Sequence, residues 1–134
     1  RNKINDTGVE FNELIQLMKP MGFHDYNHLQ KYSKAVLSDS GTISEESSIM
    51  NFPALNIREA HERPEAMEEA SVMMVGLNPD RILQGLKIIL NQKRGIERTV
   101  FQVADYSKPN VSDKILRIII SYSDYIKRTV WNDY

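Results

Sequence analysis

The chain alternates between short apolar runs and longer segments with periodic apolar positions. Short apolar runs bounded by turn residues predict buried strands, and apolar positions three or four residues apart predict helices. The expected strands cover residues 14–18, 35–37, 54–57 and 71–75. The expected helices cover residues 26–34, 42–50, 78–90 and a last segment from residue 112. This order predicts an α/β fold: a Rossmann-like three-layer domain with a mostly parallel sheet.

Local signals set the expected helix boundaries. Thr42 and Glu45 have the spacing of a capping box, and Asn78 precedes Pro79, a favoured first helical residue. Ser112 is the expected cap of the last helix. Two apolar stripes are expected to face inward: Ile82, Leu83, Leu86 and Ile89 on one helix, and Ile115, Ile119, Tyr122 and Ile126 on the last, widened by Leu116 and Ile120. Residues 92–108 give the weakest signal, and residues 100–103 fit either a strand or a loop.

Composition narrows the class of protein. The 134 residues suit one domain, and 41% hydrophobic with 26% charged residues is ordinary for a soluble globular protein. The formal net charge of −1 gives no strong attraction to nucleic acid or to an acidic membrane surface. No cysteine is present, which excludes disulfides, a thiolate nucleophile and cysteine metal sites, and favours the cytoplasm. The chain begins with Arg1 instead of methionine, which suggests a fragment, a processed form or further residues upstream.

Ligands of parallel sheets bind where the strands end, so the loops after Leu37 and Ile57 are expected to carry the chemistry. Ser40, Gly41 and Thr42 occupy the first of these strand-to-helix junctions. A glycine permits close backbone approach, and free N–H groups at a helix start favour an anion such as phosphate. The alternative is that Ser40 and Thr42 only cap a helix.

The acidic pair that follows this junction also has two interpretations. Glu45 and Glu46 lie in the first helical turn, where acids commonly act only as partners of the helix dipole. A carboxylate one turn beyond a phosphate loop could instead accept hydrogen bonds from ribose hydroxyls. Residue types alone favour the dipole role.

The second loop, residues 58–65, is densely charged. Arg58 and Arg63 could clamp a diphosphate, because guanidinium groups bind phosphate oxygens in pairs. The alternative is a self-neutralised surface loop, since three glutamates lie among the arginines.

Helical spacing raises a further candidate before these loops. His24 and His28 stand four residues apart, a spacing that suits two metal ligands, but only Asp25 lies near as a third, so solvated histidines are the favoured interpretation. Tyr26 suits packing or stacking on a flat base. The sequence lacks the Gly-rich motifs of phosphate loops and dinucleotide sites and the nucleophile elbow of hydrolases. Residue patterns alone therefore predict an α/β domain that binds an anion, and nothing more specific.

Three stretches resemble the carboxyl-terminal domain of the UDP-N-acetylglucosamine 2-epimerase family. They are Lys19-Pro20-Met21-Gly22-Phe23, Asp39-Ser40-Gly41-Thr42-Ile43-Ser44-Glu45-Glu46, and residues 58–66 with Glu62-Arg63-Pro64-Glu65-Ala66. The last is the most specific, and Glu-Arg-Pro-Glu beside Asp-Ser-Gly favours an epimerase over a glycosyltransferase. Residues 125–131 are similar to a branch that acts on UDP-linked 2-acetamido-2,6-dideoxy sugars in capsule and O-antigen synthesis.

The resemblance implies one half of a GT-B-type two-domain fold, with the active site between the halves. It implies that Ser40 and Gly41 hold the diphosphate, Glu46 the ribose and Arg63 the phosphates or the sugar, and that Tyr26 covers uracil. The sequence departs from the family's commoner Asp-Ser-Gly-Gly at Thr42, which puts close backbone approach there in doubt.

The implied mechanism removes the proton at sugar C2, expels UDP from C1, then re-protonates and re-adds UDP with the opposite C2 configuration. Arg63 would stabilise the leaving group, while the acid/base carboxylates lie in an amino-terminal domain that these residues do not contain. The fragment alone is therefore expected to be inactive, with residues 112–134 docking on that domain. No cofactor and no metal is expected, and the full-length enzyme is expected to be a homodimer. The alternatives are a non-catalytic UDP-sugar-binding module and a GT-B glycosyltransferase half.

Overall fold

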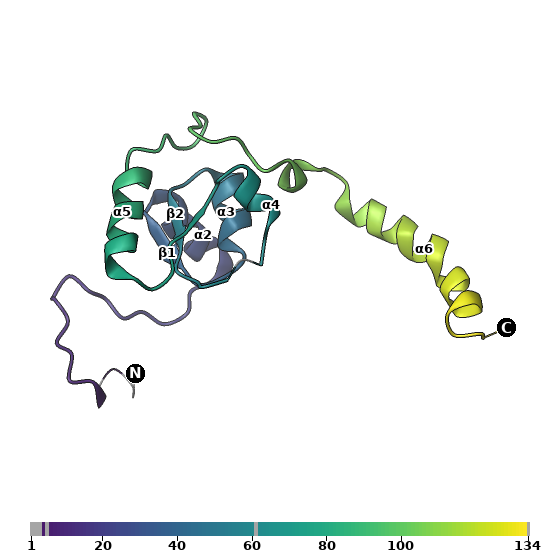
Figure 1. Cartoon of the computed structure of the whole chain (residues 1–134), viewed down its shortest axis with the longest axis horizontal. Helices are drawn as coiled ribbons and strands as arrows, with labels where there is room; N and C mark the ends of the chain where they lie inside the picture. The colour runs from purple at the N-terminus through teal and green to yellow at the C-terminus, as the bar shows by residue number, and fades with distance from the viewer. Residues whose placement is uncertain (1–3, 5, 61, 134) are drawn as a thin grey trace.

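The computed structural model of the chain describes residues 4, 6–60 and 62–133, so Arg1 and Tyr134, the ends of the predicted domain, lie outside the described part. Three short parallel strands form one sheet, which lies among the helices of the compact part of the chain (Figure 1). They are β1 (Val36–Ser38), β2 (Ala54–Asn56) and β3 (Met73–Met74). The helices are α2 (Phe23–Tyr32), α3 (Ile43–Met50), α4 (Glu65–Glu68), α5 (Pro79–Ile89), the 3-10 turn η1 (Ala104–Ser107) and α6 (Val111–Thr129).

The sheet has the order β1-β2-β3, with α3 and α4 as the two crossovers. Val36 pairs with Ala54, and Leu55 pairs with Met73. Because all three strands are parallel, their carboxyl ends meet at one edge, as the alternating pattern predicts. The three strands predicted for residues 35–37, 54–57 and 71–75 are confirmed, although β3 is reduced to two residues.

Each face of the sheet carries its own core. Ala54 packs on one side with Ile43 of α3, while Leu55 packs on the other with Ile89 of α5. The alternation along β2 thus produces the three-layer arrangement, with α3 and α5 on opposite sides of the strands (Figure 1). On α5, Gly85 allows a close approach, since a Cβ there would lie 3.1 Å from both Leu55 methyl carbons.

Helix α5 follows its local signals closely. The side chain of Asn78 accepts hydrogen bonds from the N–H groups of Asp80 and Arg81, with Pro79 at the first helical position. Ile82, Leu86 and Ile89 pack against the sheet as expected. The prediction for Leu83 is wrong, because its side chain points to solvent and is 56% exposed.

The segment before α2 contradicts the predicted strand at residues 14–18. These residues adopt turn and irregular backbone and expose their apolar side chains, with Leu14 84% exposed. A strand needs a neighbouring strand to satisfy its backbone, and the sheet in the described part of the chain offers none to this segment. Helix α2 itself begins three residues before the predicted start at Tyr26.

The segment between α5 and η1 is a loop, so residues 100–103 form no strand. It is fixed to the end of α3. Asn51, in the left-handed conformation with φ of 53°, donates from Nδ2 to the carbonyls of Gly95 and Glu97 at 2.9 and 2.6 Å. Arg98 donates to the carbonyls of Ser48 and Ile49, the last turn of α3.

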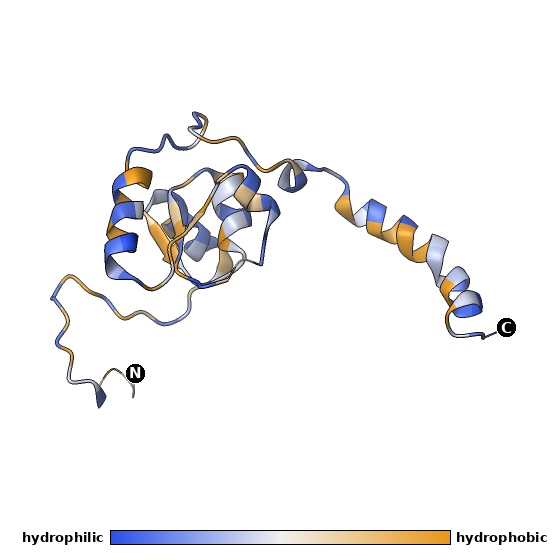
Figure 2. Cartoon of the chain, in the orientation of Figure 1, coloured by the Kyte–Doolittle hydropathy of each residue, from blue (hydrophilic) through white to orange (hydrophobic). Residues whose placement is uncertain are grey.

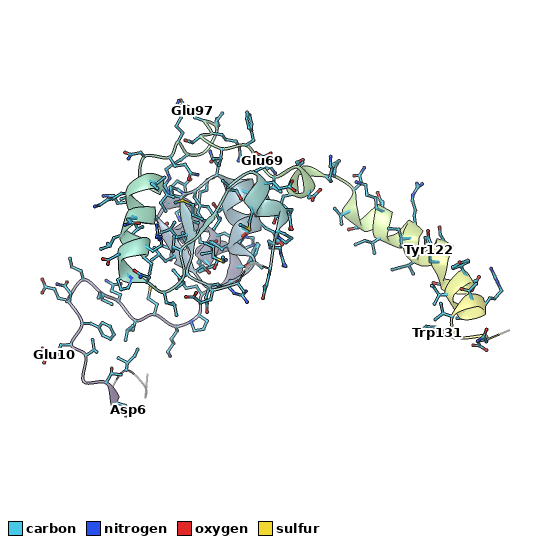
Figure 3. The ribbon with its side chains drawn as sticks, in the orientation of Figure 1. Asp6, Glu10, Glu69, Glu97, Tyr122 and Trp131 are labelled. Carbon is cyan, nitrogen blue, oxygen red and sulfur yellow. The ribbon has the colours of Figure 1, made fainter. Side chains whose placement is uncertain are left out.

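Helix α6 projects away from the sheet (Figure 1) and buries none of its residues. It begins after Asn110, so Ser112 lies inside the first turn and the predicted cap is wrong. The predicted apolar stripe is present but faces no core among the described residues: Ile119 is 54% exposed, and Figure 2 shows hydrophobic residues running along the helix. Figure 3 shows Tyr122 on α6 and Trp131 just beyond it, both far from the sheet. Among the described residues, no helix is both long and apolar enough to cross a membrane.

Candidate functional site

The junction between β1 and α3 is held together by hydroxyl groups. Ser40 N donates to Ser38 Oγ at 3.1 Å, and the Oγ of Ser40 lies 2.8 Å from Oγ1 of Thr42. Ser40 Oγ also accepts from Thr42 N at 3.3 Å. The loop therefore has a defined shape at the carboxyl end of β1, where ligands of parallel sheets bind.

The predicted capping box at this junction is wrong. Thr42 already has helical backbone angles, φ −65° and ψ −17°, and its side chain makes no cap hydrogen bond. Its hydroxyl is bonded to Ser40 instead. Thr42 is the residue directly before α3, but the Ser40 hydroxyl bonds the N–H of Thr42 and not an N–H of the helix, and Glu45 bonds to Arg63 instead of closing a capping box.

The loop after β2 folds over this junction. A Cβ added to Gly41 would lie 2.6 Å from Oε2 of Glu62, so the Glu62 carboxylate occupies the space that a larger residue at Gly41 would need. Arg58 holds that carboxylate through a 2.6 Å hydrogen bond from its Nη2 to Glu62 Oε1. This hydrogen bond, with the charge of Arg58, lowers the pKa of Glu62. The two predicted ligand loops are thus adjacent.

Arg63 reaches α3 from the same loop. Its Nε donates to Glu45 Oε1 at 2.6 Å, and about a third of each side chain is exposed, 35% and 37%. That hydrogen bond raises the pKa of Arg63, which stays cationic. Both arginines of the loop therefore pair with glutamates, as expected for a self-neutralised surface loop. Both also lie at the carboxyl edge of the sheet, where the ligand was predicted to bind.

Glu46 faces α2 and not the charged loop. Its Oε2 accepts a 2.7 Å hydrogen bond from Nε2 of Gln30, a residue that is only 3% exposed. Tyr26 stands four residues before Gln30 on α2, so the two side chains share one helix face. Tyr26 is 41% exposed and available at the surface. Sequence reasoning missed Gln30, because a glutamine on a short helix carries no residue-type signal of a site.

The histidine pair engages neighbouring rings. His24 lies edge-on to Phe23 with ring centres 5.6 Å apart, and His28 lies 4.5 Å from the ring of Tyr32. Within the described residues, no cluster of three or more potential His or carboxylate metal ligands forms.

An open hollow of about 310 Å³ lies beside these loops, at the ends of β2 and β3. Arg58 and Arg81 contribute positive charge to its lining. Glu59 closes one side, where its Oε1 accepts from the backbone N–H of Leu77 at 3.2 Å. The carboxyl edge of the sheet therefore combines a hydroxyl-rich junction, three arginines and an accessible hollow.

Comparison with known proteins matches the chain to one family. The sequence model of the family described as UDP-N-acetylglucosamine 2-epimerase matches residues 1–120. The chain is 29% identical over 117 residues to the UDP-N-acetylglucosamine 2-epimerase of Methanocaldococcus jannaschii, covering 87% of this chain and 30% of that protein. It is 33% identical over 96 residues to that of Methanococcus maripaludis, covering 69% and 26%.

Solved structures show the same relationship. The UDP-N-acetylglucosamine 2-epimerase of Rickettsia bellii superposes with a TM-score of 0.88 at 46% identity, over 97% of this chain and 36% of that one. The M. jannaschii UDP-GlcNAc 2-epimerase in complex with UDP-GlcNAc and UDP superposes with a TM-score of 0.73 at 27% identity, over 90% and 31%. These enzymes have the GT-B fold, which confirms the predicted fold class. The chain spans about a third of the length of the relatives it matches, and it belongs to the UDP-N-acetylglucosamine 2-epimerase family.

Proposed function

We propose that this chain is the carboxyl-terminal, nucleotide-binding part of a UDP-N-acetylhexosamine 2-epimerase. The observation that carries the proposal is the meeting of the Ser40-Gly41 junction with the Arg63 loop at the carboxyl edge of a parallel sheet. Family membership supports a UDP-sugar as the ligand, and the geometry of the two loops supports this edge of the sheet as the position of its diphosphate.

The diphosphate would bind at the start of α3. Gly41 lets a phosphate approach the backbone, and Ser40 adds a hydroxyl donor. The carboxylate of Glu62 lies beside Gly41 and is bound by the cationic Arg58, which supports an anion next to this arginine. Binding would exchange that carboxylate for phosphate oxygens, with Arg58 and Arg63 changing partners from glutamates to the ligand.

The nucleoside would lie against α2. Glu46 is the expected acceptor for the ribose hydroxyls, and Tyr26 the expected stacking surface for uracil. Both lie on the same side of the junction, because Glu46 is bonded to Gln30 and Tyr26 is one turn away from Gln30. Thr42 takes part through Ser40, whose hydroxyl it orients.

The reaction would proceed by elimination and re-addition of UDP. Expulsion of UDP from C1 builds negative charge on the diphosphate, and Arg63 with the N-terminus of α3 would stabilise that charge where it develops. The carboxylates that move the C2 proton would come from an amino-terminal domain, so none of the glutamates described above is assigned as the base.

Residues 112–134 would dock on that amino-terminal domain. The apolar stripe of α6 has no partner within the described part of the chain, and Trp131 beyond it is 68% exposed. We further propose a cytoplasmic homodimeric enzyme that prepares UDP-linked 2-acetamido-2,6-dideoxy sugars for bacterial surface polysaccharide.

Calorimetric titration of the chain with UDP tests the nucleotide assignment. The intact chain should bind UDP, and Arg63→Ala and Glu46→Ala should each weaken binding. Absence of binding by a chain whose folding has been confirmed by circular dichroism would reject the assignment. In a separate assay with UDP-N-acetylhexosamines, robust turnover by these 134 residues alone would reject the need for another domain.

A further inference from the structure

Gln30 is a buried polar residue in a helix whose other side chains lie mostly near the surface. It is 3% exposed, and within α2 it is the buried residue. Its Nε2 donates to Glu46 Oε2 at 2.7 Å, while its Oε1 has no hydrogen-bond partner among the described residues. If position 30 only filled space in the core, an apolar residue of the same length would be more stable there, because an unpaired buried oxygen is destabilising.

The hydrogen bond from Gln30 engages one oxygen of the carboxylate. No side-chain hydrogen bond within the described residues engages the other, Glu46 Oε1. The amide is also neutral, so it fixes the rotamer of Glu46 without cancelling its charge. The charge of the adjacent Glu45 is instead compensated, because the cationic Arg63 binds it.

The placement of α2 connects this carboxylate with the base-binding position. Gln30 lies four positions after Tyr26 on the helix, a rise of about 6 Å. Base and ribose are directly bonded in a nucleoside, so a base on Tyr26 would bring its ribose toward the carboxylate that Gln30 holds. One face of α2 would therefore serve both parts of the nucleoside.

We propose that Gln30 is a positioning residue that holds Glu46 by one oxygen and leaves the other to accept from the ribose 2′ and 3′ hydroxyls. This inference rests on the proposed nucleotide-binding function. It assigns to α2 the discrimination between ribonucleotides and analogues without a vicinal diol. A charged acceptor fixed in position distinguishes the two more strongly than a freely rotating one, because a misplaced acceptor forms no hydrogen bond.

The test compares UDP with 2′,3′-dideoxy-UDP by calorimetry. The wild-type chain should bind UDP at least tenfold more tightly than the dideoxy analogue. Gln30→Met removes the amide but keeps the length and the volume, and it should weaken UDP about tenfold while leaving dideoxy-UDP unchanged. Glu46→Gln should abolish the preference, and adding Gln30→Met to Glu46→Gln should have no further effect.

Thermal unfolding controls for folding, since each comparison uses variants that retain a cooperative transition. If Gln30→Met does not fold, Gln30→Leu and Gln30→Glu replace it; the like charge of the latter beside Glu46 should also remove the preference. A Gln30 variant that folds and keeps the full preference for UDP overturns the proposal for Gln30 alone. Failure of the folded wild-type chain to bind either nucleotide overturns the proposed function, and the proposal for Gln30 with it.

Discussion

The Nε atom of Arg63 lies 2.6 Å from Oε1 of Glu45, joining the loop after β2 to the first turn of α3. The partners are eighteen residues apart in sequence, and they connect the two segments that follow β1 and β2 at the carboxyl edge of the sheet. Because about a third of each side chain is exposed, solvent screens the pair and it contributes little to stability. The pair matters because it holds the guanidinium of Arg63 beside the first turn of α3.

Removing this guanidinium should cost nucleotide binding far more than stability. We expect Arg63→Ala to weaken UDP at least tenfold, since charge-assisted hydrogen bonds contribute about 1.5–3 kcal/mol. The matched variant Glu45→Gln should bind UDP a few times more tightly, because Arg63 loses its competing carboxylate. Calorimetry with UDP measures both effects. Equal affinity in wild type and Arg63→Ala would exclude a phosphate contact for this residue.

Gly41 offers a second test of the same place. The one overly close contact of a Cβ there would be with Oε2 of Glu62, the far end of a flexible side chain that can move aside. Gly41→Ala should therefore change the unfolding midpoint in urea very little, yet reduce UDP affinity strongly by blocking phosphate approach. Gly95→Ala is a useful contrast: nothing lies within 4 Å of a Cβ there, but its φ of 66° makes the substitution strained. It should lower stability and leave UDP affinity unchanged.

Tyr26 should contribute through its ring and not through its hydroxyl. Stacking of a base on an aromatic side chain is worth about 1–3 kcal/mol. Tyr26→Phe should preserve UDP affinity, whereas Tyr26→Ala should lower it about tenfold or more. Fluorescence or calorimetric titration is sufficient, and a loss in the phenylalanine variant as large as in the alanine variant would contradict stacking.

Asn51 should be a stability residue without a part in binding. Its left-handed backbone and its two hydrogen bonds to Gly95 and Glu97 fix the loop before η1 to α3. Asn51→Ala should lower the free energy of unfolding by about 2–4 kcal/mol, from the strain of φ 53° and the lost bonds. Asn51→Gly keeps the backbone conformation and should cost less. Urea denaturation gives the ordering, and a glycine variant less stable than the alanine variant would contradict it.

Acid should destabilise the chain partly through Glu65. Hydrogen bonds from its own backbone N–H and from the Tyr106 hydroxyl, the latter 2.9 Å long, lower the pKa of Glu65 from its ordinary value of 4.5. The folded pKa lies below the unfolded one, so the contribution to stability is present above about pH 4.5 and is lost as pH falls through the folded value. Glu65→Gln should flatten the decline of the unfolding midpoint below that pH. An unchanged slope in the variant would show that Glu65 is not linked to folding.

The parts of the fold that were predictable depend on local interactions. Asn78 and Pro79 start α5 because the cap and the ring act within one turn. Residues 14–18 have the residue pattern of a strand but no neighbouring strand in the sheet, and pairing is a non-local property. In the candidate site, Ser40, Gly41 and Arg63 were identifiable from motif resemblance. The bond between the hydroxyls of Thr42 and Ser40, and the bond from Gln30 to Glu46, depend on side-chain geometry that spacing does not encode.

The shortness of the three strands determines how their backbone opens to solvent. All three residues of β2 are buried, and it has a strand on either side, whereas β1 and β3 each pair with one neighbour within the described chain. Few ladder hydrogen bonds hold the sheet, so resistance to opening comes mainly from the two cores that meet across Ala54 and Leu55. In deuterated solvent, the amide protons of β2 should be the slowest to exchange, and those of α6 should be replaced long before them.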